Sequence, residues 1–252
     1  MIDMHSHILP GIDDGAQNVD ISVQLIEKNL RDGIKTICLT PHFNFEKQTI
    51  EQFLEERERS FDILQEAVQK EGWNVKFVLG AEVAFSTELA EQKAVERLCY
   101  GNTQCMLVEL PVAYLPKWTG DVLDELQLQG ITPLLAHVER YTYFQNEPEK
   151  LYQLLGDGCY AQVNATSIVK HKNAQKFIYL LMKHGMVHCM GSDTHSLEKR
   201  PPMIGQAQEL VEKKMGAAFV EMMHQTGTAL ATGGKAKVMP LKPIRSVFGY
   251  YF

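Results

Sequence analysis

The chain has 252 residues, a formal net charge of −6 at pH 7, 45% hydrophobic residues and 22% charged residues. This is an ordinary globular composition, which excludes a disordered chain. The acidic balance argues against a nucleic-acid partner, because phosphate backbones select basic surfaces. No apolar run is long enough to span a membrane and the N-terminus lacks a signal-peptide pattern, so we expect a cytoplasmic protein.

Strand-like and helix-like segments alternate along the chain. The expected strands cover Met1–Met4, Ile34–Leu39, Val75–Leu79, Cys105–Glu109, Ile131–Ala136, Tyr160–Val163 and Val187–Met190. The expected helices cover Val19–Arg31, Ile50–Glu71, Leu89–Leu98, Asp121–Gln129, Pro148–Leu155 and Ala174–His184. Such a repeat with short connections is typical of parallel βα units. Seven units indicate a closed or nearly closed α/β barrel. We expect one domain over residues 1–252, with a basic and aromatic tail from about residue 235.

The ends of the expected helices carry recognisable signals. Asn18 or Asp20 can cap the first helix. Five glycines fall just past helical runs, where a left-handed residue ends a helix. They are Gly33, Gly72, Gly130, Gly156 and Gly185.

The five cysteines indicate buried, reduced thiols, because their number is odd, none forms a C-x-x-C pair and most lie in apolar runs. A cysteine-based phosphatase is excluded, because it needs an arginine six positions after the nucleophile. Those positions hold Asn44, Cys105, Pro111, Ala165 and His195.

Metal-ligand residue types follow most of the expected strands. His5 and His7 follow the first strand and project to the same side, because side chains alternate along a strand. Later strand ends carry His42, Glu82, Glu109, His137, Asp193 and His195. In a parallel barrel the carboxyl ends of the strands share one rim, where such enzymes place their chemistry. Asp14, in the first loop, can reach the same rim.

Each of these residues has an ordinary explanation when it stands alone. His137 fits a core histidine, Glu109 a surface ion pair and Asp193 a helix cap. Their occurrence together, one group per strand end, favours a shared site. The other histidines lack this placement, and we expect them to be surface or packing residues; they are His171, His184, His188 and His224.

The charges of this group predict bound cations. Four carboxylates close together repel one another unless divalent metals turn that cost into a binding site. Nine ligands are too many for one ion and enough for two or three. Three dications against four carboxylates leave a formal charge of about +2, which a hydroxide reduces to about +1, and this suits a phosphate ester.

Five motifs make the chain resemble a known family. They are DMHSHILPGIDDG (3–15), TPH (40–42), GAE (80–82), HVERY (137–141) and GSDTH (191–195). With them the chain resembles the PHP (polymerase and histidinol phosphatase) superfamily, and within it the bacterial capsule- and exopolysaccharide-type tyrosine-protein phosphatases. The first motif is the most specific, because H-x-H-x-L-P-x-x-D-D-G extends beyond the general H-x-H. The segment around 224–234 departs from the usual family ending, which puts tail contacts in doubt.

The resemblance implies a distorted (β/α)7 TIM-like barrel, the PHP fold, with three divalent ions, manganese first and iron or zinc as alternatives. By motif position, His5, His7, Glu82 and Asp193 would hold one metal. Glu82 would bridge to a second, held also by Glu109 and His137. The third would be held by Asp14, His42 and His195.

The expected reaction is hydrolysis of a phosphate monoester, with metals neutralising the phosphoryl oxygens and a hydroxide attacking in line. Arg140 and Arg200 are the candidate phosphate clamps, because they closely follow His137 and His195 and a guanidinium fork matches phosphate. A surface ion pair is the alternative for each arginine. With Asp14 and His42 they are the candidate catalytic residues. The general acid stays unassigned.

The family resemblance implies a phosphotyrosine protein substrate, a bacterial tyrosine autokinase of capsule or exopolysaccharide synthesis. Aromatic residues near the rim either flank the phosphotyrosine ring or pack the loops; they are Phe43, Phe45, Tyr141, Tyr143 and Phe144. The rival functions are a small-molecule phosphatase such as histidinol phosphatase, a metal-dependent nuclease, and a phosphoprotein-binding module without turnover. The tail either packs on the barrel or contacts a membrane or partner. The oligomeric state is left open.

Overall fold

The computed structural model describes residues 1–244, 246–247 and 250–251. Its strands are β1 (Ile2–Asp3), β2 (Thr36–Leu39), β3 (His42–Phe43), β4 (Lys76–Leu79), β5 (Glu82–Ala84), β6 (Cys105–Glu109), β7 (Thr132–Leu135), β8 (Tyr160–Asn164), β9 (Cys189–Gly191), β10 (Ser246–Val247) and β11 (Tyr250–Tyr251). Its α-helices are α1 (Val19–Arg31), α2 (Ile50–Glu71), α3 (Glu88–Glu91), α4 (Thr119–Leu128), α5 (Thr142–Asn146), α6 (Pro148–Gly156), α7 (Ala165–Lys170), α8 (Lys172–Lys183), α9 (Ile204–Met215) and α10 (Ala217–Thr232), and two 3₁₀ turns cover Val95–Leu98 and Val138–Arg140.

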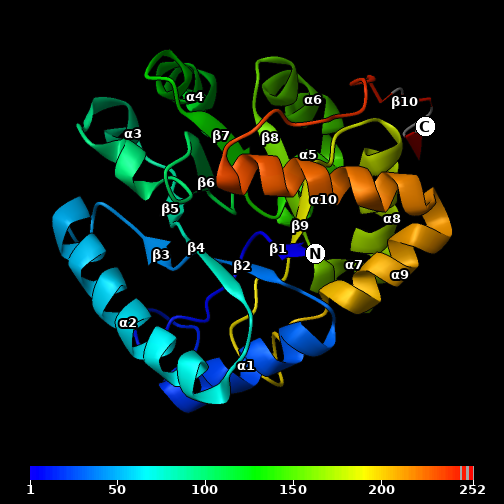
Figure 1. Cartoon of the computed structure of the whole chain (residues 1–252). Coiled ribbons are helices and arrows are strands. Elements are labelled where there is room, and N and C mark those ends of the chain that lie inside the picture. The colour runs from blue at the N-terminus through cyan, green and yellow to red at the C-terminus, as the bar shows by residue number, and fades with distance from the viewer. Residues whose placement is uncertain (245, 248–249, 252) are drawn as a thin grey trace.

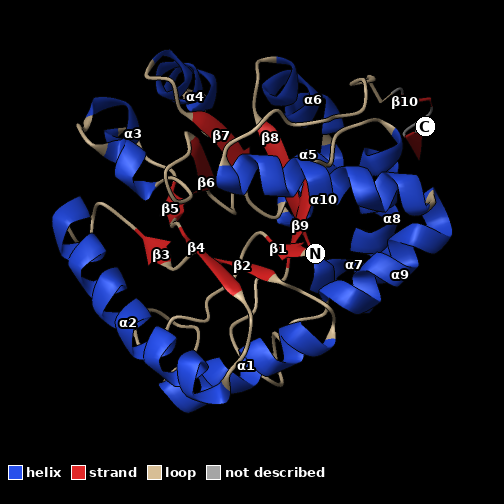
Figure 2. Ribbon diagram, viewed as in Figure 1, coloured by secondary structure: helices blue, strands red, loops and turns tan. Residues whose placement is uncertain are grey.

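Nine of these strands form a parallel ring of seven positions. One sheet has the order β1-β2-β4 and the other β3-β5-β6-β7-β8-β9. Strand β3 continues the path of β2, and β5 continues that of β4, so each of these two pairs occupies one position in the ring. The ring closes between β9 and β1, where Asp193 N–H donates to His5 O at 2.8 Å and His7 N–H to Thr194 O at 3.0 Å. Helices surround the strands (Figures 1 and 2). The predicted barrel is confirmed.

The inside of the barrel is filled by a small apolar cluster and closed at one end by α10. The cluster includes Met4, Cys38, Leu107 and Leu134, and Leu230 of α10 packs against it. Helix α10 contacts both β9 and β1, and in Figure 1 it lies across the front of the barrel, above β1. A larger apolar layer lies between strands and outer helices. Because the amino end is plugged, the carboxyl end of the barrel is left for polar residues.

The cysteine prediction is confirmed, because all five thiols are free and buried. Burial raises the pKa of each of them. They are therefore kept as neutral packing groups rather than nucleophiles.

Most predicted elements are found, and the differences have local causes. The first two helices have the predicted bounds, and the Asn18 side chain caps the first by accepting from Ile21 N–H at 3.1 Å. The expected helix 89–98 is wrong: α3 ends at Glu91, and Ala94 adopts φ 66° before the 3₁₀ turn. Gly156 does not end its helix in a left-handed conformation; Gly158 does, at φ 103°.

The described part of the tail packs on the barrel. Lys242 N–H donates to His184 O at 2.9 Å, Thr226 Oγ1 donates to Lys237 O, and Ile244 is buried. The predicted contact of the tail with a membrane or partner rests mainly on its last, aromatic residues. Arg245, Phe248 and Phe252 among them lie outside the described residues. Over residues 233–244 packing is therefore the better interpretation.

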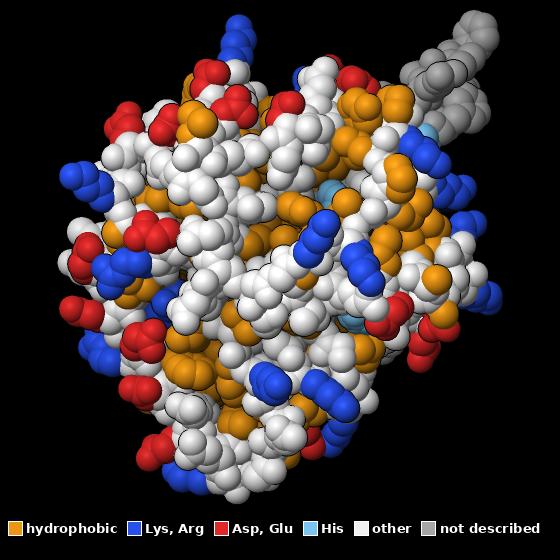
Figure 3. All heavy atoms as spheres, turned by 45° about the horizontal axis from the view of Figure 1, so that its top comes forward, with side chains coloured by type: hydrophobic (Ala, Val, Ile, Leu, Met, Phe, Trp, Pro, Cys, Tyr) orange, Lys and Arg blue, Asp and Glu red, His pale blue; other side chains and the backbone are white. Residues whose placement is uncertain are grey.

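Acidic and basic side chains are interspersed over the face drawn in Figure 3, with apolar patches between them. Within the described residues no helix combines the length and apolarity that a bilayer crossing requires.

His188 is a buried packing histidine that makes stability depend on pH. It is 8% exposed, its Nδ1 accepts from Ala161 N–H at 2.9 Å, and burial lowers its pKa to about 4. An unfolded histidine has a pKa of about 6.5. Between these values the unfolded chain binds a proton that the folded chain does not, so this group makes stability fall as pH falls below 6.5.

We expect the replacement His188→Gln, which stays neutral, to remove this dependence. On going from pH 7.5 to pH 5.5, the wild type should lose about 1 kcal/mol more of its free energy of unfolding than the variant does. Urea denaturation of both proteins at the two pH values measures it. A difference that is the same at both pH values would contradict the prediction.

Candidate metal centre

All nine predicted ligands come together at the carboxyl end of the strands. His5 and His7 follow β1, and Asp14 lies in the loop before α1. Strand β3 begins at His42 and β5 at Glu82, whereas β6 ends at Glu109. His137 follows β7, and Asp193 and His195 follow β9. The geometric expectation that these distant residues meet at one rim is therefore met.

Glu82 lies at the middle of the group. Its side chain is 1% exposed, and Oε2 lies 3.1 Å from Nε2 of both His5 and His7 and 3.2 Å from His42 Nδ1. Oε1 lies 2.9 Å from His137 Nε2, which is itself 3.4 Å from Glu109 Oε1. One buried carboxylate thus contacts four imidazoles, as a residue shared between metals would.

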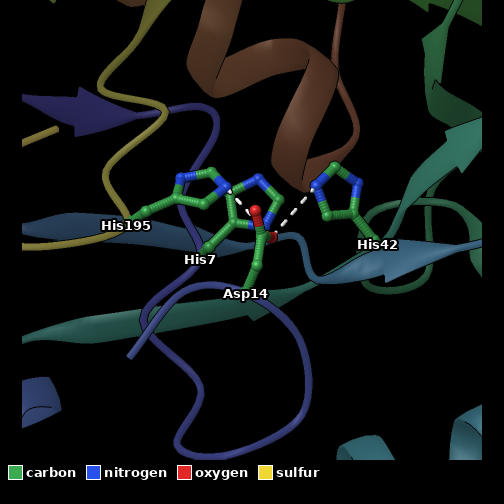
Figure 4. Close-up of side chains that lie close together, drawn as sticks. All are labelled: His7, Asp14, His42 and His195. Carbon is green, nitrogen blue, oxygen red and sulfur yellow. Dashed lines mark ion pairs between the residues drawn. The ribbon is translucent and has the colours of Figure 1, made fainter. Parts of the chain in front are cut away.

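Asp14 closes the group from the solvent side. Its Oδ1 lies 3.5 Å from His42 Nε2 and 3.4 Å from His195 Nε2, and Figure 4 shows the carboxylate between the two rings. The side chain is 68% exposed, in contrast to the buried Glu82. Asp14 is therefore the ligand candidate nearest the mouth of the site.

The side chains fall into three groups whose donor atoms lie within 4.8 Å of one another. The groups are His7, Asp14, His42 and His195; His5, His7 and Asp193; and His42, Glu82 and Glu109. They overlap the three sets that the family resemblance implies but are not identical to them: His7 and His42 each belong to two groups, and His137 belongs to none. Imidazole and carboxylate donors in this number suit divalent first-row ions.

Two buried polar atoms lack a hydrogen-bond partner among the described residues and face this group: Asp193 Oδ1 and His195 Nε2. Such atoms are costly to bury unless something satisfies them. Asp193 Oδ1 lies 3.6 Å from His7 Nε2 and 3.7 Å from His5 Nε2. The donor set therefore fits metal ions, which would satisfy these atoms.

Hydrogen bonds behind the imidazoles fix which nitrogen faces the centre. His7 Nδ1 donates to Asp13 Oδ2 at 2.7 Å, and His195 Nδ1 donates to the carbonyl of Asp193 at 3.0 Å. His5 Nδ1 lies 3.2 Å from Gln162 Oε1, which also accepts from His137 N–H at 2.9 Å. Because each partner is an acceptor, Nδ1 carries the proton and Nε2 is left as the inward ligand atom.

The electrostatics favour charged carboxylates. Burial alone would raise the pKa of Glu82, but contacts with His5, His137 and His7 hold it well below its usual value. Burial opposes protonation of His7 and His137 too, but Asp13 and Glu82 raise the pKa of His7 to about 10, and Glu109 and Glu82 that of His137 to about 9. Protons on these imidazoles balance the carboxylates here, and metal ions would take their place.

The backbone is strained at two candidate ligands. His137 has φ 32° and Asp193 has φ 50°, and the one other non-glycine residue with positive φ in the described chain is Ala94. Such conformations cost about 1–3 kcal/mol and persist where the surroundings impose them, often at functional sites. The strain here turns two side chains into the rim directly after their strands.

Close backbone packing explains two glycines of the motifs. A Cβ on Gly15 would lie 2.2 Å from His7 O, and one on Gly191 would lie 2.5 Å from His5 Cβ. Both glycines therefore let neighbouring segments approach the H-x-H segment, which holds the two histidines in register with β9.

Strand β8 supplies no predicted ligand, but it carries two polar residues that the sequence reasoning missed. Gln162 and Asn164 are 0% and 3% exposed. Gln162 contacts His5 and His137 as described, and its Nε2 donates to Asn164 Oδ1 at 2.9 Å. Asn164 Nδ2 then donates to Asp193 Oδ2 at 2.7 Å. Polar residues two apart in an otherwise buried strand were the available signal.

The candidate phosphate clamps lie beside the group, in contact with a candidate ligand. Arg200 donates from its NH2 group to Asp193 Oδ2 at 2.6 Å, and Arg140 from its NH1 group to the same oxygen at 3.3 Å. Their side chains are 36% and 40% exposed. Both guanidinium groups therefore have one side on the rim and another toward solvent.

Of the two alternatives left open for the aromatic residues near the rim, packing of the loops is the one that burial supports for four of the five, whereas Phe45 is partly exposed. Phe43, Tyr141 and Phe144 are fully buried, and Tyr143 is nearly so. Tyr141 and Tyr143 stack with ring centroids 5.2 Å apart, and Tyr141 OH accepts from Leu110 N–H. These rings pack the loops. The remaining histidines lie outside the metal-ligand group, as expected.

The fold and donor set define a class: parallel α/β barrels with a histidine- and carboxylate-rich candidate metal centre on the carboxyl rim. Residues 1–229 match the family described as "Capsular polysaccharide synthesis, CpsB/CapC". The chain belongs to this family, and the resemblance to capsule-type phosphatases is confirmed.

Named relatives and solved structures are similar over nearly the whole chain. The tyrosine-protein phosphatase CpsB of Streptococcus pneumoniae is 30% identical over 230 residues, 86% of this chain and 92% of that protein. The tyrosine-protein phosphatase YwqE of Bacillus subtilis is 29% identical over 256 residues, all of both chains. A crystal structure from work on YwqE and CpsB, described as unique metal-dependent tyrosine phosphatases, matches with a TM-score of 0.90 at 27% identity over 98% of this chain and 100% of that chain. An organophosphorus hydrolase at 12% identity and a TM-score of 0.53 shares the fold alone.

We expect Gln162→Met to weaken metal binding, because it keeps the side-chain volume but removes the acceptor behind His5 and His137. Loss of such a partner typically costs about 10–100-fold in metal affinity. Titration calorimetry of chelator-treated protein with Mn²⁺ measures it. Gln175→Met is the matched control, because the Gln175 side chain donates to Ile168 O on α7 rather than to any of the nine candidate ligands. Equal Mn²⁺ affinity in wild type and Gln162→Met would contradict the prediction.

Proposed function

We propose that this chain is a metal-dependent phosphatase that removes phosphate from tyrosine residues of proteins. The observation that carries the proposal is the convergence of four carboxylates and five imidazoles at one rim, with two arginines beside them. The family and the similar named tyrosine-protein phosphatases support it. The fully buried cysteines leave no thiol for the cysteine-based mechanism.

The metals of this proposal are three divalent ions, with manganese as the first choice and iron or zinc as alternatives. His5, His7, Glu82 and Asp193 would hold one, Glu82, Glu109 and His137 another, and Asp14, His42 and His195 the third. When bound, such ions polarise phosphoryl oxygens and make a water molecule more acidic.

The chain's own residues would position the substrate. Arg140 and Arg200 share Asp193 Oδ2 and are partly exposed, so each can turn a donor toward a phosphoryl oxygen while remaining near the rim. Asp14 and His42 stand at the mouth, where they would contact the incoming group. A phenolate leaving group, with a pKa of about 10, needs less help from an acid than an alkoxide does.

A cavity beside the candidate ligands offers space for the tyrosine ring. Its volume is about 500 Å³, and Ile21 and Leu197 give it apolar walls, while Asp14, His195 and Arg200 line its polar side. The ring would thus lie against these two aliphatic side chains rather than against the buried aromatic residues of the loops. A ring held there would present its phosphate to the metal-ligand group.

The natural substrate that we propose is an autophosphorylated bacterial tyrosine kinase of capsule or exopolysaccharide synthesis, met in the cytoplasm. The family description supports the polysaccharide connection. A small-molecule phosphatase acting on histidinol phosphate would use the same metals and is the alternative.

Phosphate release from three substrates distinguishes these functions. With Mn²⁺ we expect rapid turnover of a phosphotyrosyl peptide, much slower turnover of histidinol phosphate and none of an oligonucleotide, with all activity lost in excess chelator. Glu82→Gln should lose bound metal and turnover together, because the shared carboxylate charge is gone. Faster turnover of histidinol phosphate than of the peptide would favour the alternative, and full activity in chelator would refute a metal mechanism.

Arg140→Ala should lower kcat/KM for the phosphotyrosyl peptide by about 10–100-fold, the size expected for a lost charge-assisted hydrogen bond. Metal content, measured by atomic absorption, should stay as in wild type, which separates substrate binding from support of Asp193. Arg59→Ala is the control, because Arg59 lies exposed on α2 with its Nε donating to Glu55 O. An unchanged kcat/KM in Arg140→Ala would remove this residue from the substrate site.

A further inference from the structure

A second cavity shares a wall with the candidate metal centre and has cationic side chains around its opening. Its volume is about 440 Å³. The cavity is lined on one side by Arg140, Arg200 and Asp193, so it lies directly next to the candidate metal centre. Its other lining groups come from the 3₁₀ turn Val138–Arg140, α5, the end of β8, α7, the start of α8 and Lys199.

The exposed charges of this cavity are all positive or imidazole. Lys170, His171 and Lys199 are exposed, and no described residue forms an ion pair with either lysine. The two carboxylates of the lining are buried: Glu139 is 1% exposed and Asp193 3%. Asp193 is also occupied by both arginines. A ligand entering from solvent therefore meets cations, on a chain whose overall charge is −6.

The first turn of α8 adds to this field. The helix begins at Lys172 after His171, no side chain caps it, and Ala174 of its first turn lines the cavity. Unpaired N–H groups and the positive end of a helix dipole favour an anion nearby. The start of α8 and the two lysines therefore both favour a negatively charged ligand in this cavity.

The two cavities meet at one short segment. Lys199 and Arg200 line both the cavity with the apolar walls of Ile21 and Leu197 and this cationic one. The acidic neighbour Glu198 lines only the former. A peptide whose tyrosine ring lies in the first cavity can therefore pass over this segment and place a neighbouring side chain in the second.

We propose that the cavity lined by Lys170, His171 and Lys199 is a substrate subsite for an acidic side chain, glutamate or aspartate, close in sequence to the phosphotyrosine. This proposal rests on the proposed function and adds a sequence preference to it. Exposed charge pairs contribute little individually, so the subsite would favour acidic substrates by about 5-fold rather than by orders of magnitude.

The test compares two phosphotyrosyl peptides of otherwise identical sequence. One has glutamate, and the other glutamine, at the residue before and the residue after the phosphotyrosine. With Mn²⁺ at low ionic strength, wild type should give a kcat/KM about 5-fold higher for the glutamate peptide. Since the interaction is between exposed charges, the ratio should approach one in 0.5 M NaCl.

Lys170→Glu should reduce the ratio to one or below. Lys70→Glu is the matched control with the same change in net charge, since Lys70 is exposed in the last turn of α2, before the chain enters the amino end of β4, and it should keep the wild-type ratio. Turnover of the glutamine peptide reports whether the variant is folded. If that turnover is lost, two other measurements test the subsite: Lys199→Gln should lower the ratio, and added salt should lower the ratio of the wild type.

The outcomes separate the two proposals. If wild type hydrolyses neither peptide, the proposed function fails. If it hydrolyses both with equal kcat/KM, or if Lys70→Glu lowers the ratio as much as Lys170→Glu, phosphatase function stands and the acidic subsite is overturned.

Discussion

A buried carboxylate surrounded by imidazoles is the interaction on which the rest of this structure depends. Glu82 is almost inaccessible to water, and four histidines lie within 3.2 Å of its oxygens. An unpaired buried carboxylate would be costly enough to be protonated instead. The histidines prevent this, so a negative charge is kept at the centre of the barrel mouth. Such a permanent charge, with imidazole nitrogens turned inward that would exchange their protons for metal, is what a cluster of divalent cations needs.

The closed barrel is what makes this arrangement possible from residues so far apart in sequence. His5 and Asp193 meet because β9 pairs with the segment after β1, through Asp193 N–H to His5 O and the bridge between Ser6 and Thr194. Gly191 permits the approach. An open sheet would leave the two segments at opposite edges. Ring closure, Glu82 and the strained φ of Asp193 are thus linked, since each positions groups that the others require.

The parts that could be predicted are those governed by local pattern. Helical periodicity located α1 and α2, and the rule that parallel strands share a carboxyl rim assembled all nine candidate ligands. The missed parts depend on packing in three dimensions. Helix α10 covers the barrel end with Gly227 against Met4, which no amphipathic pattern reveals. From the sequence, Gln162 and Asn164 are predicted only as strand residues. Their role depends on their contacts with His5 and Asp193, which the sequence does not show. For Tyr141 and Phe144 the sequence left open whether they flank a substrate or pack the loops, and only their burial in three dimensions favours packing.

Burial divides the polar residues of the rim into two working sets. Glu82, Asp193 and four of the five imidazoles, all but His42, are buried. Partners such as Asp13, Gln162 and Asn164 hold them, so their positions are fixed before anything binds. Arg140, Lys170 and Lys199 are exposed and can adapt. Fixed donors suit metal ions, whose coordination tolerates little error. Mobile cations suit a flexible peptide, because weak, screened contacts can discriminate among substrates and still let the product leave. The boundary between the sets runs through Asp193, whose one oxygen faces the imidazoles while the other holds both arginines.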